Sequence, residues 1–411
     1  MEQSAASLVP ANDVPTKASL LSLTLNLITG ALGSGILSVP WGMAGASMIG
    51  SILIVAVVLA LNAWTNMILV NAGDKYKKFN LGSLLGDIPG PLGTATRATC
   101  EVMIYVSIFG CLVGYMIIVA DSLTPLLHKP SFWPFDGRSF WITLGSLIVL
   151  PLCLLPQKYL SISSSLCIAV NIYIVCLLIY LLGQQGPTSR VCAFGVTSGF
   201  VTMVSATMQC CIISMCILPM YEELERRTPK RFRLAIVTGF SFVFVIFAGF
   251  ASLGYFLYGA HVESNILKNL PQSPGGDVAR GGMVLVVAGV YPIMIQSMIA
   301  PVREFVKASG RSKAWVQVAT ATIVFCAMGV SFGVTDLGIM NTINGAVCVF
   351  FFVGLAPGMA GIFLLYRGDS LRRNTMIVLI VLCFAASVAG FFFLDNDYAK
   401  LLISCNLWVE R

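Results

Sequence analysis

The sequence contains few charged residues. Only 10% of its 411 residues are Asp, Glu, Lys or Arg, whereas 57% are hydrophobic and the mean hydropathy is +0.88. A soluble domain carries roughly 25% charged residues, so this deficit excludes a set of soluble domains and indicates an integral membrane protein. The net charge of +7 is explained by loops that face anionic membrane lipid. A nucleic-acid partner is therefore not expected.

Residues that bind metals or perform catalysis are scarce as well. The two histidines, His128 and His261, lie in predicted loops, and the sequence has no HExxH motif and no CxxC pair. These absences exclude common metal and nucleophile–histidine sites. Ten of the 13 cysteines lie in apolar runs, where we expect small hydrophobic residues rather than a disulfide framework. We predict a protein that is not an enzyme and has no cofactor.

Long apolar runs, by contrast, are numerous. A helix needs roughly 20 apolar residues to cross a bilayer, and about eleven runs meet this requirement. We therefore predict an all-α membrane protein with an N-terminal tail over 1–18, a transmembrane domain over 19–394 and a short C-terminal tail over 395–411. The predicted spans lie near residues 20–45, 48–72, 97–127, 138–156, 160–183, 193–224, 232–258, 279–303, 313–332, 338–366 and 374–394.

The distribution of Lys and Arg predicts the orientation. If the N-terminus is cytoplasmic, 18 of the 25 basic residues fall in cytoplasmic segments and 7 in outside segments, as the positive-inside rule requires. An odd number of spans then places the C-terminal tail outside. We expect a monomer in the plasma membrane or in a vacuolar or lysosomal membrane.

Two predicted spans are interrupted near their middle. The first contains GALGSGILSVPWGM, residues 30–43, and the sixth contains TMQCC, residues 207–211, upstream of Pro219. The interruptions are five spans apart, the spacing of two inverted repeats of five spans with an eleventh helix appended. Non-helical backbone at this depth is tolerated where it is buried or lines a cavity. Paired interruptions therefore predict a transporter binding site.

Close helix packing is the alternative explanation for the first interruption. Gly30-xxx-Ser34 and Ala31-xxx-Gly35 are small-xxx-small patterns, which let helices approach each other without any ligand. The second interruption at the matching position favours binding. Free backbone N–H groups and the positive end of a half-helix would then attract an anionic group such as a carboxylate.

Several stretches resemble one family of membrane proteins. NLITGALGSGILSVPWGM, residues 26–43, is similar to the first span of the amino acid/auxin permease family. LPMYEELERRTPKRF, residues 218–232, resembles the end of the sixth span in its sodium-coupled neutral amino acid transporter branch. The resemblance extends over about residues 20–394. It implies a leucine-transporter-type fold of 5+5 inverted repeats plus one helix, with spans 1 and 6 broken, that carries amino acids by alternating access.

The resemblance also implies a substrate site. The carboxylate of the amino acid would meet the backbone of the span 1 break, and its ammonium group the carbonyls of the span 6 break. Tyr115 would wall the pocket, although a packing role is the alternative. Thr29 lies where the family has polar groups, but its hydroxyl could instead bond within its own helix. The implied substrate-binding residues are Thr29, Gly33, Ser34, Gly35, Tyr115, Gln209, Cys210, Cys211 and Ser214.

A sodium site is less complete in this sequence. In the family it joins span 1 carbonyls to a hydroxyl on span 8, but the corresponding positions here are Pro292 and Met294. Neither side chain offers the oxygen ligand that a hard cation prefers, and the nearest polar candidates are Gln296 and Ser297. The candidate Na⁺ ligands are Asn26, Ala31, Leu32, Gln296 and Ser297.

The choice between Na⁺, H⁺ and no coupling ion stays open. Proton coupling needs a titratable group within the membrane, and Glu101 and Asp121 lie at the two ends of span 3. Glu222 and Glu223 close span 6, either as partners of nearby arginines or as part of a cytoplasmic gate. No acidic residue lies in QCCIIS, residues 209–214, so a neutral amino acid is expected. An amino-acid sensor with cytoplasmic partners is the alternative, but the short tail and loops favour a transporter.

Overall fold

Long apolar helices make up nearly all of the fold. The computed structural model describes residues 18–31, 34–127, 134–154, 162–188, 190–310, 312, 314–394, 401 and 403–410. Within these ranges, eight helices are long and apolar enough to cross a membrane, and one bent pair gives a ninth. Each of the eleven predicted spans coincides with a helix or with a run of shorter helices. The prediction of an all-α multi-pass membrane protein is confirmed.

The sequence explains where the continuous spans begin and end, because their apolar runs are bounded by capping residues and prolines. They are α3 (Met48–Tyr76), α5 (Pro91–Leu126), α6 (Gly137–Cys153), α7 (Ile162–Gln185), α10 (Pro229–Tyr258), α11 (Pro274–Met298), α13 (Ala314–Gly333) and α16 (Ser370–Phe392). The tenth span consists of α14 (Leu337–Cys348), η5 (Val349–Leu355), α15 (Ala356–Ala360) and η6 (Gly361–Leu365). The short connecting helices are α4 (Leu81–Gly86), η3 (Gly259–His261), η4 (Ile266–Lys268) and α12 (Ala300–Ala308).

Spans 1 and 6 are the interrupted ones. Span 1 consists of α1 (Leu20–Ala31), the short helix η1 (Ser34–Ser38) and α2 (Val39–Ala46). The halves Leu20–Ala31 and Gly35–Ala46 are bent by 48°. Span 6 consists of α8 (Gly199–Cys210) and α9 (Ile217–Glu223), joined by non-helical residues 211–216. Proline occupies the first turn of α2, where it can begin a helix but cannot continue the preceding one.

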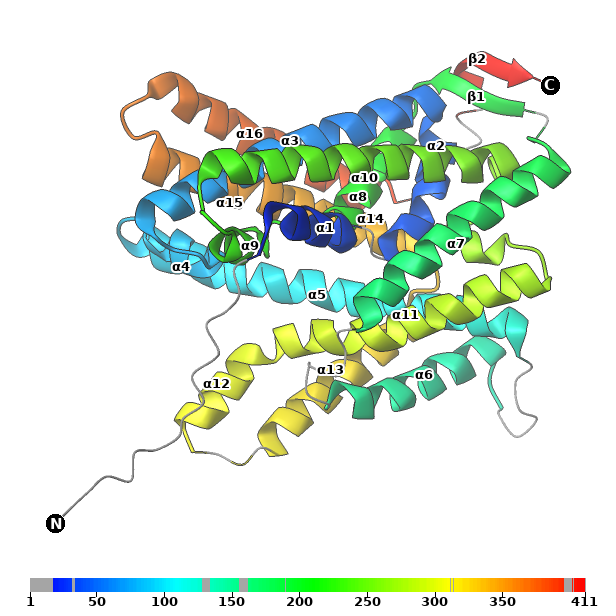
Figure 1. Ribbon diagram of the computed structural model, residues 1–411, viewed down its shortest axis with the longest axis horizontal. Helices are drawn as coiled ribbons and strands as arrows, with labels where there is room; N and C mark the ends of the chain where they lie inside the picture. The colour runs from blue at the N-terminus through cyan, green and yellow to red at the C-terminus, as the bar shows by residue number, and fades with distance from the viewer. Residues whose placement is uncertain are drawn as a thin grey trace.

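The two ends of the bundle differ. Figure 1 shows α4, α9 and α12 at one end and a two-stranded sheet at the other. In this sheet β1 (Arg190–Gly195) pairs antiparallel with β2 (Cys405–Glu410). We call the first end the α9 end and the second the sheet end. The sheet end bears the C-terminal strand.

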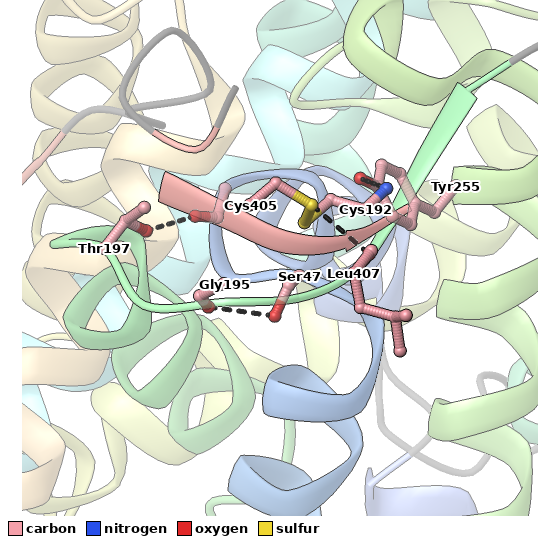
Figure 2. Close-up of a disulfide and its surroundings, with 8 residues drawn as sticks. Ser47, Cys192, Gly195, Thr197, Tyr255, Cys405 and Leu407 are labelled. Carbon is pink, nitrogen blue, oxygen red and sulfur yellow. Dashed lines mark hydrogen bonds between the residues drawn. A yellow bond between two sulfur atoms is a disulfide. The ribbon is translucent and has the colours of Figure 1, made fainter. Parts of the chain in front are cut away.

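A disulfide between Cys192 and Cys405 joins the two strands (Figure 2). The expectation of free thiols holds for all ten cysteines of the apolar runs, whereas these two lie outside such runs and were not predicted to pair. The Oγ of Ser47 donates a hydrogen bond to the carbonyl oxygen of Gly195 (3.1 Å), and the backbone N–H of Cys192 donates to the Tyr255 hydroxyl (3.0 Å). The sheet is therefore fastened to the junction of spans 1 and 2 and to span 7.

Candidate functional site

A cavity of about 1000 Å³ lies between the broken helices and α5, α11 and α14. Its lining follows α5 from Arg97 to Tyr115, which is about 27 Å of helix at 1.5 Å per residue. Arg97 is exposed near α4, whereas Tyr115 is buried. The volume is at the upper end of the usual range for ligand cavities, roughly 300–1,000 Å³. The cavity therefore combines a small-molecule site with an access path from the α9 end.

The two breaks meet at the wall of this cavity. A Cβ atom placed on Gly35 would lie 3.0 Å from the Cys210 Sγ and 3.5 Å from the Cys210 Cα. The first distance is tighter than nearly all real Cβ contacts, so a residue without a side chain suits this position. Both residues line the cavity. The backbones of spans 1 and 6 thus come together at one place, as their matching positions in the sequence predicted.

Span 10 holds the span 1 break through a buried polar chain. The Nδ2 of Asn341 donates to the Oγ of Ser38 (2.7 Å), which in turn donates to the carbonyl oxygen of Gly35 (3.0 Å). Asn341 also lines the cavity, and sequence reasoning missed it. The available signal was a pair of asparagines, Asn341 and Asn344, three residues apart in an apolar span. Such a pair shares one helix face and is unusual in lipid.

Span 2 binds the span 6 break on the side that faces away from the cavity. The Nδ2 of Asn62 donates to the carbonyl oxygen of Cys211 (2.9 Å), and Asn66 donates to the Oδ1 of Asn62 (2.7 Å). All three residues are fully buried. The Cys211 carbonyl, which was predicted to receive the ammonium group, is thus bound to α3, and Cys211 does not line the cavity. Ser214 is also buried away from the lining.

Of three further residues predicted to bind substrate, two line the cavity and one forms a hydrogen bond within its own helix. Gln209 and Tyr115 line the cavity. The Nε2 of Gln209 donates to the Cys111 Sγ (3.2 Å), while its buried Oε1 has no hydrogen-bond partner. The Tyr115 ring packs against Tyr291 at 6.3 Å between centroids. Thr29 is not in the lining, and its Oγ1 donates to the Leu25 carbonyl oxygen (2.8 Å), the alternative considered for this residue.

The candidate Na⁺ ligands are only partly assembled. Asn26 and Ser297 line the same cavity, and the Oγ of Ser297 donates to a carbonyl oxygen of its own helix. Ala31 and Gln296 are buried and absent from the lining. Of the other predicted positions in the break, Leu32 and Gly33 lie outside the described residues, and so does the side chain of Ser34.

Charge is confined to the open end of the cavity. Arg97 and Glu101 are the charged residues of the lining that the structure describes, and they pair at 3.2 Å. Both are more than half exposed. The deep part is formed by apolar side chains such as Ile213, Met294 and Leu337. A bound molecule would therefore meet backbone and amide groups there, but no full charge from the described residues.

A buried ion pair lies beyond Tyr115 on α5, toward the sheet end. Asp121 of α5 accepts a hydrogen bond from Arg138 of α6, and their side chains are 3% and 21% exposed. The Nδ2 of Asn265 donates to the other carboxylate oxygen (3.1 Å), and Arg138 also donates to the Thr335 carbonyl oxygen (3.1 Å). We call these four residues the outer latch. They join four segments that are distant in the sequence.

The arginines beside α9 do not form the ion pairs considered for Glu222 and Glu223. Within the described residues, the guanidinium of Arg227 stacks on the Phe79 ring at 4.2 Å and also approaches Tyr221. Stacking of this kind keeps a cation at the membrane surface without an acidic partner. The two glutamates are exposed at the end of α9.

Solved structures with the same fold are transporters. The chain aligns with MhsT in complex with L-phenylalanine at a TM-score of 0.56 and 13% identity, covering 92% of this chain and 99% of MhsT. It aligns with inward-facing Mhp1 at a TM-score of 0.57 and 15% identity, covering 97% and 98%. At this identity the likeness concerns the fold alone. It confirms the predicted leucine-transporter-type architecture.

Sequence relatives are named as amino acid transporters. Amino acid transporter AVT6E of Arabidopsis thaliana is 27% identical over 297 residues, covering 66% of this chain and 60% of the relative. Sodium-coupled neutral amino acid transporter 7 of Xenopus laevis is 24% identical over 293 residues, covering 65% and 62%. The chain thus spans about three fifths of the length of these two relatives.

A family model described as transmembrane amino acid transporter protein matches residues 16–394. This range contains every helix described above and both broken spans. The family consists of transporters rather than enzymes. Because the match covers nearly the whole chain, the protein belongs to the family of transmembrane amino acid transporter proteins, as its resemblance to amino acid/auxin permeases predicted.

Proposed function

We propose that this chain is a secondary active transporter that moves neutral amino acids across a membrane by alternating access. The observation that carries the proposal is the cavity between the broken helices, which is open at the α9 end and whose lining on α5 ends at Tyr115, short of the outer latch. We infer that the latch keeps the sheet end closed. A site accessible from one side only is what alternating access requires of each state. The relatives named as amino acid transporters support the substrate class.

The proposed substrate lies across the two breaks. Its carboxylate would accept hydrogen bonds from the backbone N–H groups of the span 1 break, near Gly35. Its ammonium group would donate to the Gln209 Oε1, which is buried without a partner. The side chain would then lie among Tyr115, Ile213 and Met294. A cationic or anionic side chain would have to be desolvated there without a described counter-charge, which is costly, so a neutral one is favoured.

Symport with Na⁺ or H⁺ is the proposed energy source. For Na⁺, the oxygens of Asn26 and Ser297 reach the cavity and are of the hard type that this ion prefers. For H⁺, Asp121 is the buried carboxylate of the latch, so its protonation would weaken the ion pair with Arg138. Na⁺ would thus act at the cavity beside the span 1 break, and H⁺ would act on the outer latch. Both are places that must change conformation during transport.

The proposed orientation has the N-terminus in the cytoplasm. Disulfides persist in oxidising compartments, and Cys192–Cys405 lies at the sheet end. The first described residue, Ala18, pairs with Leu224 beside α9 at the opposite end. Together with the bias in Lys and Arg, this supports an external or lumenal sheet end. We propose that the transporter acts as a monomer.

The test is uptake into proteoliposomes, using a panel of radiolabelled amino acids with sodium and pH gradients imposed separately. Accumulation of neutral amino acids under either gradient is the expected result, and the effective gradient identifies the ion. Uptake of basic or acidic amino acids instead would contradict the proposed substrate class. Saturable binding without flux under any gradient would replace the transporter with an amino-acid sensor of the same fold.

A further inference from the structure

A second hollow lies on the outside of the bundle, where α3 and α10 pack against each other. It has a volume of about 410 Å³ and is separate in its lining from the transport cavity. Its polar residues are Asn71 of α3 and Lys230 and Arg233 of α10, near the α9 end. Its other lining residues are Ala63, Trp64, Met67, Pro229, Ile236 and Val237. We call this hollow the α3–α10 groove.

The polar and apolar parts of the groove are separated along the helix axes. On α3, Asn71 is eight residues from Ala63, which is about 12 Å. On α10, the two cations lie in the first turns and Val237 follows one turn after Arg233. Trp64 and Val237 are 42% and 53% exposed, so the apolar part is open on the side that faces lipid. The groove is therefore amphipathic, with its polar end toward the membrane surface.

The position of the cations relative to the bilayer follows from helix length. The 30 residues of α10 extend for about 45 Å, whereas the hydrocarbon core is about 30 Å thick. The first turns, with Lys230 and Arg233, thus fall at the level of the lipid headgroups. Neither cation forms an ion pair with another described residue. Both are exposed, and no described residue compensates their charge.

We propose that the α3–α10 groove binds an anionic phospholipid of the surrounding membrane. The phosphate group would lie between Lys230 and Arg233 with Asn71 as a further donor, and an acyl chain would follow Met67 and Val237. An anionic lipid fits both parts of the groove. A soluble anion would leave the apolar part unfilled, and a zwitterionic lipid carries no net charge to neutralise the two cations. Basic pockets between membrane helices are suited to such headgroups.

The groove joins two helices that hold the transport site. The α3 helix carries Asn62, which binds the carbonyl oxygen of the span 6 break. The α10 helix packs against both halves of span 1. A lipid bound between α3 and α10 would therefore contact both helices that hold the interrupted spans. Lipid binding could in this way affect transport.

The test is direct binding of fluorescent phosphatidylglycerol to the purified full-length protein in a neutral detergent, with fluorescent phosphatidylcholine as the comparison lipid. Replacing both cations, Lys230→Gln with Arg233→Gln, should weaken phosphatidylglycerol binding about twenty-five-fold, because each cation contributes about fivefold near an anionic headgroup. The matched control is Arg226→Gln with Arg231→Gln. It removes the same charge from the same segment outside the groove and should change binding less than threefold.

A third variant tests the apolar half. Val237→Trp fills the groove while both cations stay, and it should also weaken phosphatidylglycerol binding at least fivefold. Competition by glycerol phosphate separates the sources of the anion: weak competition supports a lipid, and full competition at millimolar concentration indicates a free phosphate site instead. Equal losses in the groove and control pairs, or equal binding of phosphatidylcholine, would overturn the proposal. Gel filtration of each variant establishes that it is folded and monodisperse.

Discussion

At the scale of single residues, the contact between Gly35 and Cys210 defines how closely spans 1 and 6 approach. The Cys210 sulfur lies 3.0 Å from the place of a Cβ on Gly35, and the Cys210 backbone lies half an ångström further away at 3.5 Å. The sulfur is thus the nearest obstacle to a side chain at position 35. A methyl group there would displace it by a few tenths of an ångström and move the span 6 break.

We therefore expect Gly35→Ala to lower amino-acid affinity about tenfold, measured by equilibrium binding to the purified protein. Removing the sulfur with Cys210→Ala should restore most of the loss, because the two changes are coupled through one contact. Gly249→Ala on α10 is the matched control, since a Cβ there meets nothing within 4 Å. If the double variant binds as weakly as Gly35→Ala alone, the obstacle is not the sulfur.

At the scale of elements, the helices and their breaks were predictable, whereas the contacts that hold them were not. Apolar runs of sufficient length predict the spans. Glycines mark the interruption of span 1, and Pro219 follows the non-helical residues 211–216 of span 6. The bond from Asn341 to Ser38 crosses 303 positions of sequence, and the one from Asn62 to Cys211 crosses 149. Such pairs depend on which helices become neighbours, and a single sequence does not contain that information.

The outer latch joins several elements, and its proposed role in keeping the sheet end closed can be tested directly. Asp121→Asn removes the charge that holds Arg138 and leaves a partly buried cation without its partner, which is a large penalty, about 3–5 kcal/mol in buried pairs. We expect the sheet end to open more often. Labelling of Cys111 in the cavity by a membrane-impermeant thiol reagent added at that end should rise severalfold.

The control is Glu263→Gln in the loop that follows η3. Glu263 pairs with Lys268 at 3.1 Å, and both side chains are about half exposed, so this change should leave labelling nearly unaltered, as exposed pairs contribute little. Unchanged labelling of Cys111 in the Asp121→Asn protein would mean that the latch does not keep the sheet end closed.

At the scale of the whole molecule, the disulfide connects the middle of the sequence to the strand near its C-terminus. Cys192 and Cys405 are 213 positions apart, and spans 6 to 11 lie between them. The bond therefore fixes the C-terminal strand to the segment before α8. The β1 strand is in turn bound to Ser47, the residue between α2 and α3. The sequence predicted an outside position for the C-terminal tail, but it contained no signal for the pairing of Cys405 with Cys192.

Removing the bond with Cys192→Ser and Cys405→Ser together should lower the midpoint of thermal unfolding by several degrees. A loop of this length corresponds to about 5 kcal/mol for a random unfolded chain, but the spans stay helical in a membrane or micelle, so the measured loss should be smaller. In sealed vesicles of known orientation, an impermeant reductant should produce the same decrease when it is added at the sheet end and none when it is added at the α9 end. The opposite sidedness would invert the proposed orientation, with the N-terminus outside the cytoplasm and the cavity of this structure open to the external or lumenal side.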